Sequence, residues 1–121
     1  RNMDHLFSQP WVGASWEGFV IEQVINHLKA ADKVFHPYYL RTSDQYEIDL
    51  ILDFGGRLYA IEVKLTSSPD SDDVSRFRKA AEMIKARRCL LISRTQDYIT
   101  SENFVSANMQ QALDFLRADT R

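Results

Sequence analysis

The sequence has little cysteine, proline or glycine. Its 121 residues include one cysteine, three prolines and four glycines. A single cysteine excludes an intrachain disulfide and is typical of a reducing compartment such as the cytoplasm. Cys89 begins the apolar run Cys-Leu-Leu-Ile, which indicates a buried structural thiol. His5, His27 and His36 are widely spaced and have no cysteine partners, so we do not expect a structural zinc site.

Long apolar runs and an excess of charge of one sign are also absent. No run approaches the roughly 20 residues of a membrane helix, and no basic segment precedes an apolar one at the start, so we expect a soluble domain without a signal peptide. The net charge of -2 and the pI near 5.9 argue against a protein that coats nucleic acid non-specifically. These values do not exclude an enzyme that binds phosphates through a local basic patch.

What is present is an ordinary globular balance, with 45% hydrophobic and 26% charged residues, enough for one domain with a core. Hydrophobic periodicity predicts the order α-β-β-β-α-β-(β)-α, one mixed sheet flanked by helices. The expected helices cover residues 14–30, about 73–86 and 107–116. The expected strands cover residues 34–41, 46–54, 58–65 and 89–93, with a final strand that ends at residue 104 or 105. Residues 1–12 show no periodicity and are expected to be the edge of a longer protein.

The first predicted helix carries an acid on its apolar face. A helical wheel of about 100° per residue places Glu17 among Val20, Val24 and Leu28. A carboxylate buried without a partner is costly, so Glu17 requires a cation or strong donors. The alternative is that this carboxylate near the helix start reaches water or caps a neighbouring loop. The helix alone favours neither interpretation.

The dipeptide of Gly55 and Gly56 predicts a two-residue turn between two alternating strands. This turn fixes a register in which one face is apolar throughout, with the pairs Leu52–Tyr59, Leu50–Ile61 and Ile48–Val63. A slip by one residue would mix the faces, so the apolar pairs support the register. On the other face, Asp49 lies opposite Glu62 and Glu47 lies opposite Lys64.

Like charges that face each other across a sheet are destabilising unless something neutralises them. The carboxylates of Asp49 and Glu62, with Glu17 from a packed helix, would form a hard oxygen site suited to Mg²⁺ or Mn²⁺. Lys64 follows Glu62 by two residues, so its ammonium would reach the same pocket. The alternative is a solvated hairpin face with a surface pair between Glu47 and Lys64.

The order of a helix Glu, a strand Asp and then Glu-Val-Lys resembles the PD-(D/E)xK restriction-endonuclease-like superfamily. A longer stretch, from Gly13-Ala-Ser-Trp-Glu through Tyr46-Glu-Ile-Asp to Glu62-Val-Lys, is similar to the C-terminal domain of unknown function in prokaryotic AAA-type ATPases. The resemblance covers residues 13–94 and, more loosely, extends to 116. It implies a three-layer α-β-α fold in residues 13–94, a cytoplasmic prokaryotic protein and an ATPase module on the same chain.

The resemblance also implies roles for individual residues. Asp49 and Glu62 would bind one or two Mg²⁺ or Mn²⁺ ions, with Glu17 and the carbonyl of Val63 as further ligands. Lys64 would position or activate the attacking water. Ile48 stands where the motif has proline, which lowers the specificity of the match.

The expected activity is hydrolysis of phosphodiester bonds in DNA by a metal-dependent endonuclease or exonuclease. Arg41, Arg76 and Lys79 are the cations expected to contact the nucleic acid; for most of the other basic residues on the second helix, a solvated face is the simpler interpretation. Two alternatives remain. One is a non-cleaving module that binds nucleic acid or regulates the attached ATPase, and the other is an assembly domain. The sequence does not exclude a homodimer.

Overall fold

Residues 6–8 and 15–120 are described by the computed structural model of the chain. The expected boundary between fragment edge and domain core, at residues 12 and 13, lies outside them. Within these described residues there are three helices: α1 (Trp16–Ala30), α2 (Ser71–Met83) and α3 (Met109–Asp119). The strands are β1 (Leu6–Ser8), β2 (His36–Arg41), β3 (Glu47–Phe54), β4 (Arg57–Val63), β5 (Arg88–Ile92), β6 (Ile99–Thr100) and β7 (Phe104–Ala107).

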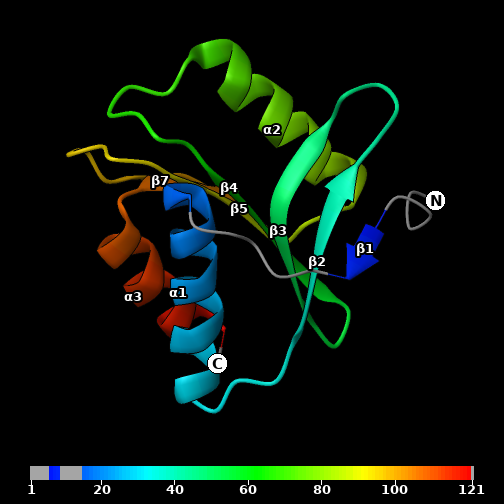
Figure 1. Cartoon of the computed structure of the whole chain (residues 1–121), viewed down its shortest axis with the longest axis vertical. Helices are drawn as coiled ribbons and strands as arrows, with labels where there is room; N and C mark the ends of the chain where they lie inside the picture. Colours follow the sequence, from blue (N-terminus) through cyan, green and yellow to red (C-terminus); the bar gives the residue numbers. More distant parts are fainter. Residues whose placement is uncertain (1–5, 9–14, 121) are drawn as a thin grey trace.

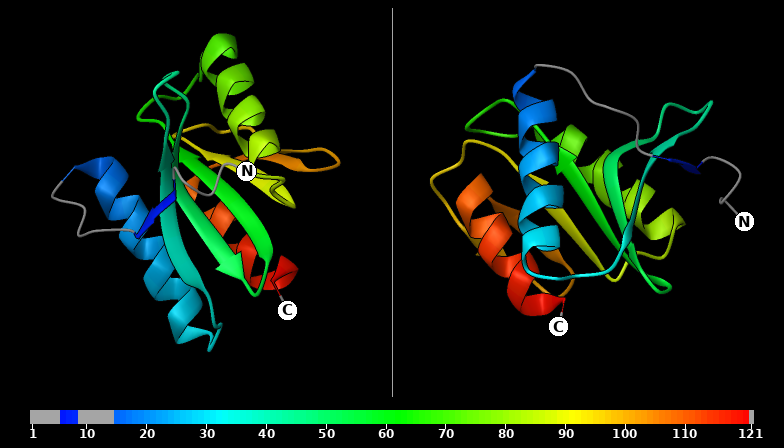
Figure 2. Two further views of the ribbon diagram at one scale, coloured as in Figure 1. Left: turned by 90° about the vertical axis from the view of Figure 1, so that its right-hand side faces the viewer. Right: turned by 60° about the horizontal axis from the view of Figure 1, so that its bottom comes forward.

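The strands form one mixed sheet in the order β1-β2-β3-β4-β5-β7-β6. The pairs from β1 to β4 are antiparallel, β4–β5 and β5–β7 are parallel, and β6 returns antiparallel to β7. Helices α1 and α3 lie on one side of the sheet, and α2 lies on the other (Figures 1 and 2). The predicted three-layer α-β-α architecture is confirmed. Short edge strands β1 and β6 are additions to the predicted order.

The helices begin after capping residues and bury apolar side chains. Ser15 caps α1, because its hydroxyl accepts a hydrogen bond from the N–H of Gly18 at 3.0 Å. On α2, Phe77 and Ala81 are buried. The thiol of Cys89 is buried, as predicted, in the core layer beneath α2. No helix among the described residues has the length and apolarity needed to cross a membrane.

The turn between β3 and β4 has the predicted chemistry. Gly55 and Gly56 both have positive φ, 67° and 101°, a backbone conformation that residues other than glycine adopt only at a steric cost. Asp53 Oδ1 accepts the N–H of Gly56 at 2.7 Å and closes the turn. The predicted register is confirmed for the pairs nearest the turn, Leu52–Tyr59 and Leu50–Ile61.

Farther from the turn, the predicted pairing of Ile48 with Val63 is wrong. Between the pairs Tyr38–Ile51 and Leu40–Ile48, β3 advances by one residue more than β2, which is a β-bulge in β3. The extra residue reverses the side of the sheet that Ile48 faces. Ile48 therefore packs in the core beneath α2, whereas Leu50 and Val63 pack in the core beneath α1 and α3.

Candidate functional site

The candidate site lies where β3 and β4 part. Their backbone ladder ends at Leu50–Ile61, one step before the two acids. Beyond that point, side chains bridge the strands: Asp49 Oδ2 accepts the N–H of Val63 at 2.9 Å, and Glu62 Oε1 accepts the N–H of Asp49 at 3.4 Å. Strand β4 meanwhile stays paired with β5 as far as Val63. The two carboxylates therefore take the positions that ladder hydrogen bonds would occupy.

Lys64 extends this site toward α2. Its Nζ lies 3.5 Å from Glu62 Oε2 and 3.9 Å from Asp73 Oδ2, at the first turn of α2. Glu62 is largely buried, with an 11% exposed side chain, whereas that of Lys64 is 34% exposed. These residues line a cavity of about 160 Å³ together with Gln45, Tyr46, Glu47, Arg76 and Phe77. The predicted approach of Lys64 to Glu62 is therefore confirmed.

Burial and mutual repulsion set the electrostatics of the acids. Burial, followed by the negative charge of Asp49, raises the pKa of Glu62 from 4.5 to about 8, although Lys64 partly offsets both effects. Burial also raises the pKa of Asp49, against the opposing hydrogen bond from Val63 and the charge of Lys64. Partial burial alone would lower the pKa of Lys64, but the carboxylates of Glu62 and Asp73 outweigh it and raise the pKa. Two carboxylates and one ammonium thus leave the site short of positive charge.

Glu17 lies at the border of this site. It stands in the first turn of α1, half-buried rather than fully buried. Its negative charge is one of the causes that raise the pKa of Asp49, so the two carboxylates are within electrostatic reach. Among residues 6–8 and 15–120, however, no three His, Cys, Asp or Glu side chains form a group arranged to hold a metal ion. The carboxylates of Asp49 and Glu62 each accept a hydrogen bond from the backbone of the other strand.

The three expected nucleic-acid contacts occupy different places. Arg76 donates a hydrogen bond to the carbonyl of Gln45 at 2.9 Å, and its guanidinium lies 4.9 Å from the ring centroid of Tyr46. Lys79 instead lines a separate groove on α2. Arg41 is exposed at the end of β2, 5.8 Å from the ring centroid of Tyr39. Arg76 thus contacts the protein's own 42–46 loop beside the acids.

Sequence reasoning missed Asp73 and the 42–46 loop as parts of the site. The loop is closed by hydrogen bonds between Thr42 and Tyr46, and Gln45 adopts a positive φ of 69°. The sequence gives one reason for Asp73 at its position: an acid in the first turn of a helix is favoured by the helix dipole. This reason explains why Asp73 stands on α2 but does not predict its contact with Lys64.

The chain is similar to known proteins over most of its length. Residues 12–112 match the model of a family described as a domain of unknown function, DUF4143. Uncharacterized proteins of Mycobacterium bovis and Mycobacterium tuberculosis are each 36% identical over 107 residues. The match covers 86% of this chain and 22% of each relative, so the chain spans about a fifth of the relatives' length.

The crystal structure of protein VC1899 from Vibrio cholerae has a similar fold. Its TM-score is 0.52, with 16% sequence identity, and the match covers 86% of this chain and 33% of that one. At this level of identity, the likeness concerns the fold alone. The family match extends over most of the chain and includes the acids and Lys64. The chain therefore belongs to the DUF4143 family, a domain of unknown function.

Proposed function

We propose that this domain is a Mg²⁺- or Mn²⁺-dependent nuclease of the PD-(D/E)xK type that hydrolyses phosphodiester bonds of DNA. The observation that carries the proposal is the contact set of Asp49, Glu62 and Lys64 at the point where β3 and β4 part. Buried carboxylates side by side destabilise a protein unless a cation, a proton or hydrogen-bond donors neutralise them, and such groups cluster at sites of binding or catalysis. The order of a helix Glu, a strand Asp and then Glu-Val-Lys, which resembles the PD-(D/E)xK superfamily, suggests phosphodiester hydrolysis as the reaction.

The chemistry of the donors fits a hard divalent cation. Mg²⁺ is commonly held by one or two protein carboxylates and keeps several waters, so Asp49 and Glu62 are sufficient anchors. A cation would also offset the burial and the repulsion from Asp49, which together raise the pKa of Glu62 to about 8. The carbonyl of Val63 and the carboxylate of Glu17 are the further oxygen ligands in the proposal. When bound, the ion would act as a Lewis acid toward the scissile phosphate.

The side chains of the site would orient the carboxylates, stabilise the developing charge and bind the substrate. The N–H of Val63 fixes Asp49 Oδ2, so the orientation of this carboxylate is set before a substrate arrives. Lys64 is anchored by Glu62 and Asp73 on two sides, which holds its ammonium near the acids. There it would stabilise the negative charge that develops on the phosphoryl oxygens. Arg41 and Lys79 are both exposed, and they would bind phosphates of the DNA farther from the scissile bond.

A second candidate is a non-catalytic module that binds nucleic acid or regulates an attached ATPase. Two observations favour it: the absence of a three-ligand group among the described residues, and the greater length of the mycobacterial relatives. In this candidate the module would follow an ATPase on one chain, as the resemblance to the C-terminal domain of AAA-type ATPases implies. In this case the acids would serve regulation or assembly instead of hydrolysis.

Plasmid nicking distinguishes the two candidates. Supercoiled plasmid is incubated with Mg²⁺ or Mn²⁺ and the wild-type chain, Asp49→Ala, Lys64→Ala or the control Glu22→Gln on α1. The nuclease proposal predicts nicking by the wild type and the control and none by the other two. Equal nicking by all four proteins would indicate that a contaminating nuclease causes the activity. No nicking together with a salt-dependent shift of DNA would support the binding module.

A further inference from the structure

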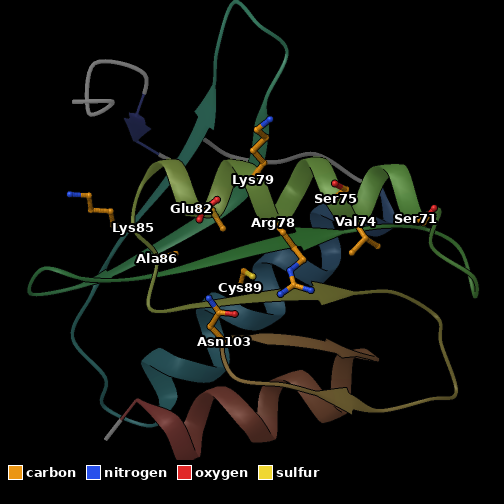
Figure 3. Close-up of a pocket in the computed structure, with 11 residues that line it drawn as sticks. Ser71, Val74, Ser75, Arg78, Lys79, Glu82, Lys85, Ala86, Cys89 and Asn103 are labelled. Atoms are coloured by element: carbon orange, nitrogen blue, oxygen red, sulfur yellow. The ribbon is translucent and has the colours of Figure 1, made fainter.

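A larger groove lies along α2, away from the acids. Its volume is about 760 Å³, and it shares no lining residue with the acidic cavity. Residues of α2 form one wall, and Cys89 of β5 with Asn103, just before β7, forms the other (Figure 3). Small apolar side chains, Val74, Ala81 and Ala86, contribute to the lining. The groove thus combines an apolar part with polar and charged side chains.

Arg78 is the most informative residue in the groove. Arg78 is exposed, but its guanidinium lies 4.7 Å from the ring centroid of the buried Phe104, and this contact favours the observed side-chain position. Figure 3 shows Arg78 pointing from α2 toward the sheet, beside Cys89 and Asn103. Within the part of the chain that the structure describes, the guanidinium has no hydrogen-bond or ion-pair partner. A positioned arginine therefore presents its donors to the groove.

The charge around the groove favours an anion. Arg78, Lys79 and Lys85 line it together with one carboxylate, that of Glu82. Figure 3 shows Lys79 pointing from α2 away from the sheet and Lys85 pointing outward from the turn after α2, so among these cations it is Arg78 that points toward Cys89 and Asn103. A guanidinium group matches the geometry of a phosphate, which it binds in a bidentate manner.

We propose that this groove binds an organic phosphate of nucleotide size. Pockets for such ligands have volumes of about 300–1,000 Å³, and the groove falls in this range, which far exceeds the size of inorganic phosphate. Arg78 would hold the phosphate, and Val74 with its apolar neighbours would contact the organic part. The amide of Asn103 can both donate and accept hydrogen bonds to that part.

The test is calorimetric titration of the chain with ATP, tripolyphosphate and adenosine in the presence of EDTA. EDTA removes divalent ions, so binding in this groove is measured independently of the acidic site and of any cleavage. The proposal predicts that ATP binds more tightly than either fragment. It also predicts that Arg78→Gln weakens ATP binding by about tenfold, the usual loss for a charge-assisted hydrogen bond. Asn103→Ala should weaken it without removing charge.

Arg117→Gln is the matched control, because it removes the same charge from α3 on the opposite side of the sheet. It should leave ATP binding unchanged, and circular dichroism should show that all variants remain folded. The proposal is overturned if ATP gives no binding, if the two arginine variants lose affinity equally, or if tripolyphosphate binds as tightly as ATP. Displacement of ATP by polyglutamate with higher affinity would assign the groove to an acidic peptide instead.

Discussion

The backbone N–H of Val63 donates a hydrogen bond to Asp49 Oδ2 at 2.9 Å, just past the last ladder pair of β3 and β4. A side chain of one strand thus satisfies the backbone of the other at the point where they separate. The reciprocal contact, from the N–H of Asp49 to Glu62 Oε1, is longer at 3.4 Å. The acids are therefore part of the structure of the hairpin end as well as candidates for chemistry.

The raised pKa of Glu62 predicts a pH-dependent stability. Between pH 4.5 and about 8, the folded chain retains a proton on Glu62 that the unfolded chain releases. Without divalent ions, the free energy of unfolding should therefore fall as pH rises through this range, by at most about 1.4 kcal/mol per pH unit from this group. Urea unfolding in EDTA at pH 5, 6, 7 and 8 measures this dependence.

Glu62→Gln is the matched variant for the pH experiment, since it preserves size and removes the titration. Its free energy of unfolding should decline less than that of the wild type between pH 5 and 8. Identical pH profiles for the two proteins would show that Glu62 titrates near its ordinary value. A wild-type stability that rises relative to the variant would contradict the sign of the shift.

Lys64 should contribute to cleavage more than to metal binding. In the proposed mechanism, its ammonium acts on charge that develops at the phosphate, so Lys64→Met should lower the rate by about 10²–10³-fold. Binding of Mn²⁺ should persist in this variant, because the carboxylates remain. Single-turnover cleavage, with Mn²⁺ titrations on the same samples, separates the two effects.

Asp73→Asn provides the comparison for Lys64. The distance from Asp73 Oδ2 to Lys64 Nζ is 3.9 Å, and the Asp73 side chain is 47% exposed, so solvent screens this ion pair. The rate should fall by less than about tenfold, because Glu62 still anchors the ammonium. If Asp73→Asn lost as much activity as Lys64→Met, Asp73 would have a direct role in the reaction.

The C-terminal end of α3 is held by a separate cluster. Asp119 accepts hydrogen bonds from the fully buried Tyr59, at 2.8 Å, and from Arg88, at 3.1 Å. Asp119→Ala should lower the free energy of unfolding by about 1–3 kcal/mol, because the hydroxyl of Tyr59 loses its side-chain acceptor. Asp114→Ala, at an exposed position on the same helix, should change it by less than about 0.5 kcal/mol. Equal losses in urea unfolding would contradict the role given to Asp119.

The predictable part of the fold rests on local signals. The glycine pair at residues 55 and 56 requires positive φ, and it sets the register that brings Leu50 opposite Ile61. Continuing that register places Asp49 beside Glu62, and the structure brings them together through hydrogen bonds between side chain and backbone. Alternation along both strands was sufficient because burial on each face penalises a slip of one residue.

The remaining features depend on partners distant in the sequence. The bulge that turns Ile48 toward α2 arises from the pairing of β3 with β2, which the alternation of β3 alone does not encode. Arg76 contacts Gln45, 31 residues away, so its helical position gave no indication of that partner. Strands β1 and β6 have three and two residues, too few to produce a readable period.

The proposed nuclease requires that the acids at the end of β3 and β4 bind a divalent cation. Electron paramagnetic resonance measures Mn²⁺ binding by the wild type, Asp49→Asn and the exposed control Asp114→Asn at pH 8. We expect saturable binding by the wild type and the control, and a loss of at least about tenfold in affinity for Asp49→Asn. Equal Mn²⁺ affinity in all three proteins would show that these acids do not bind the cation.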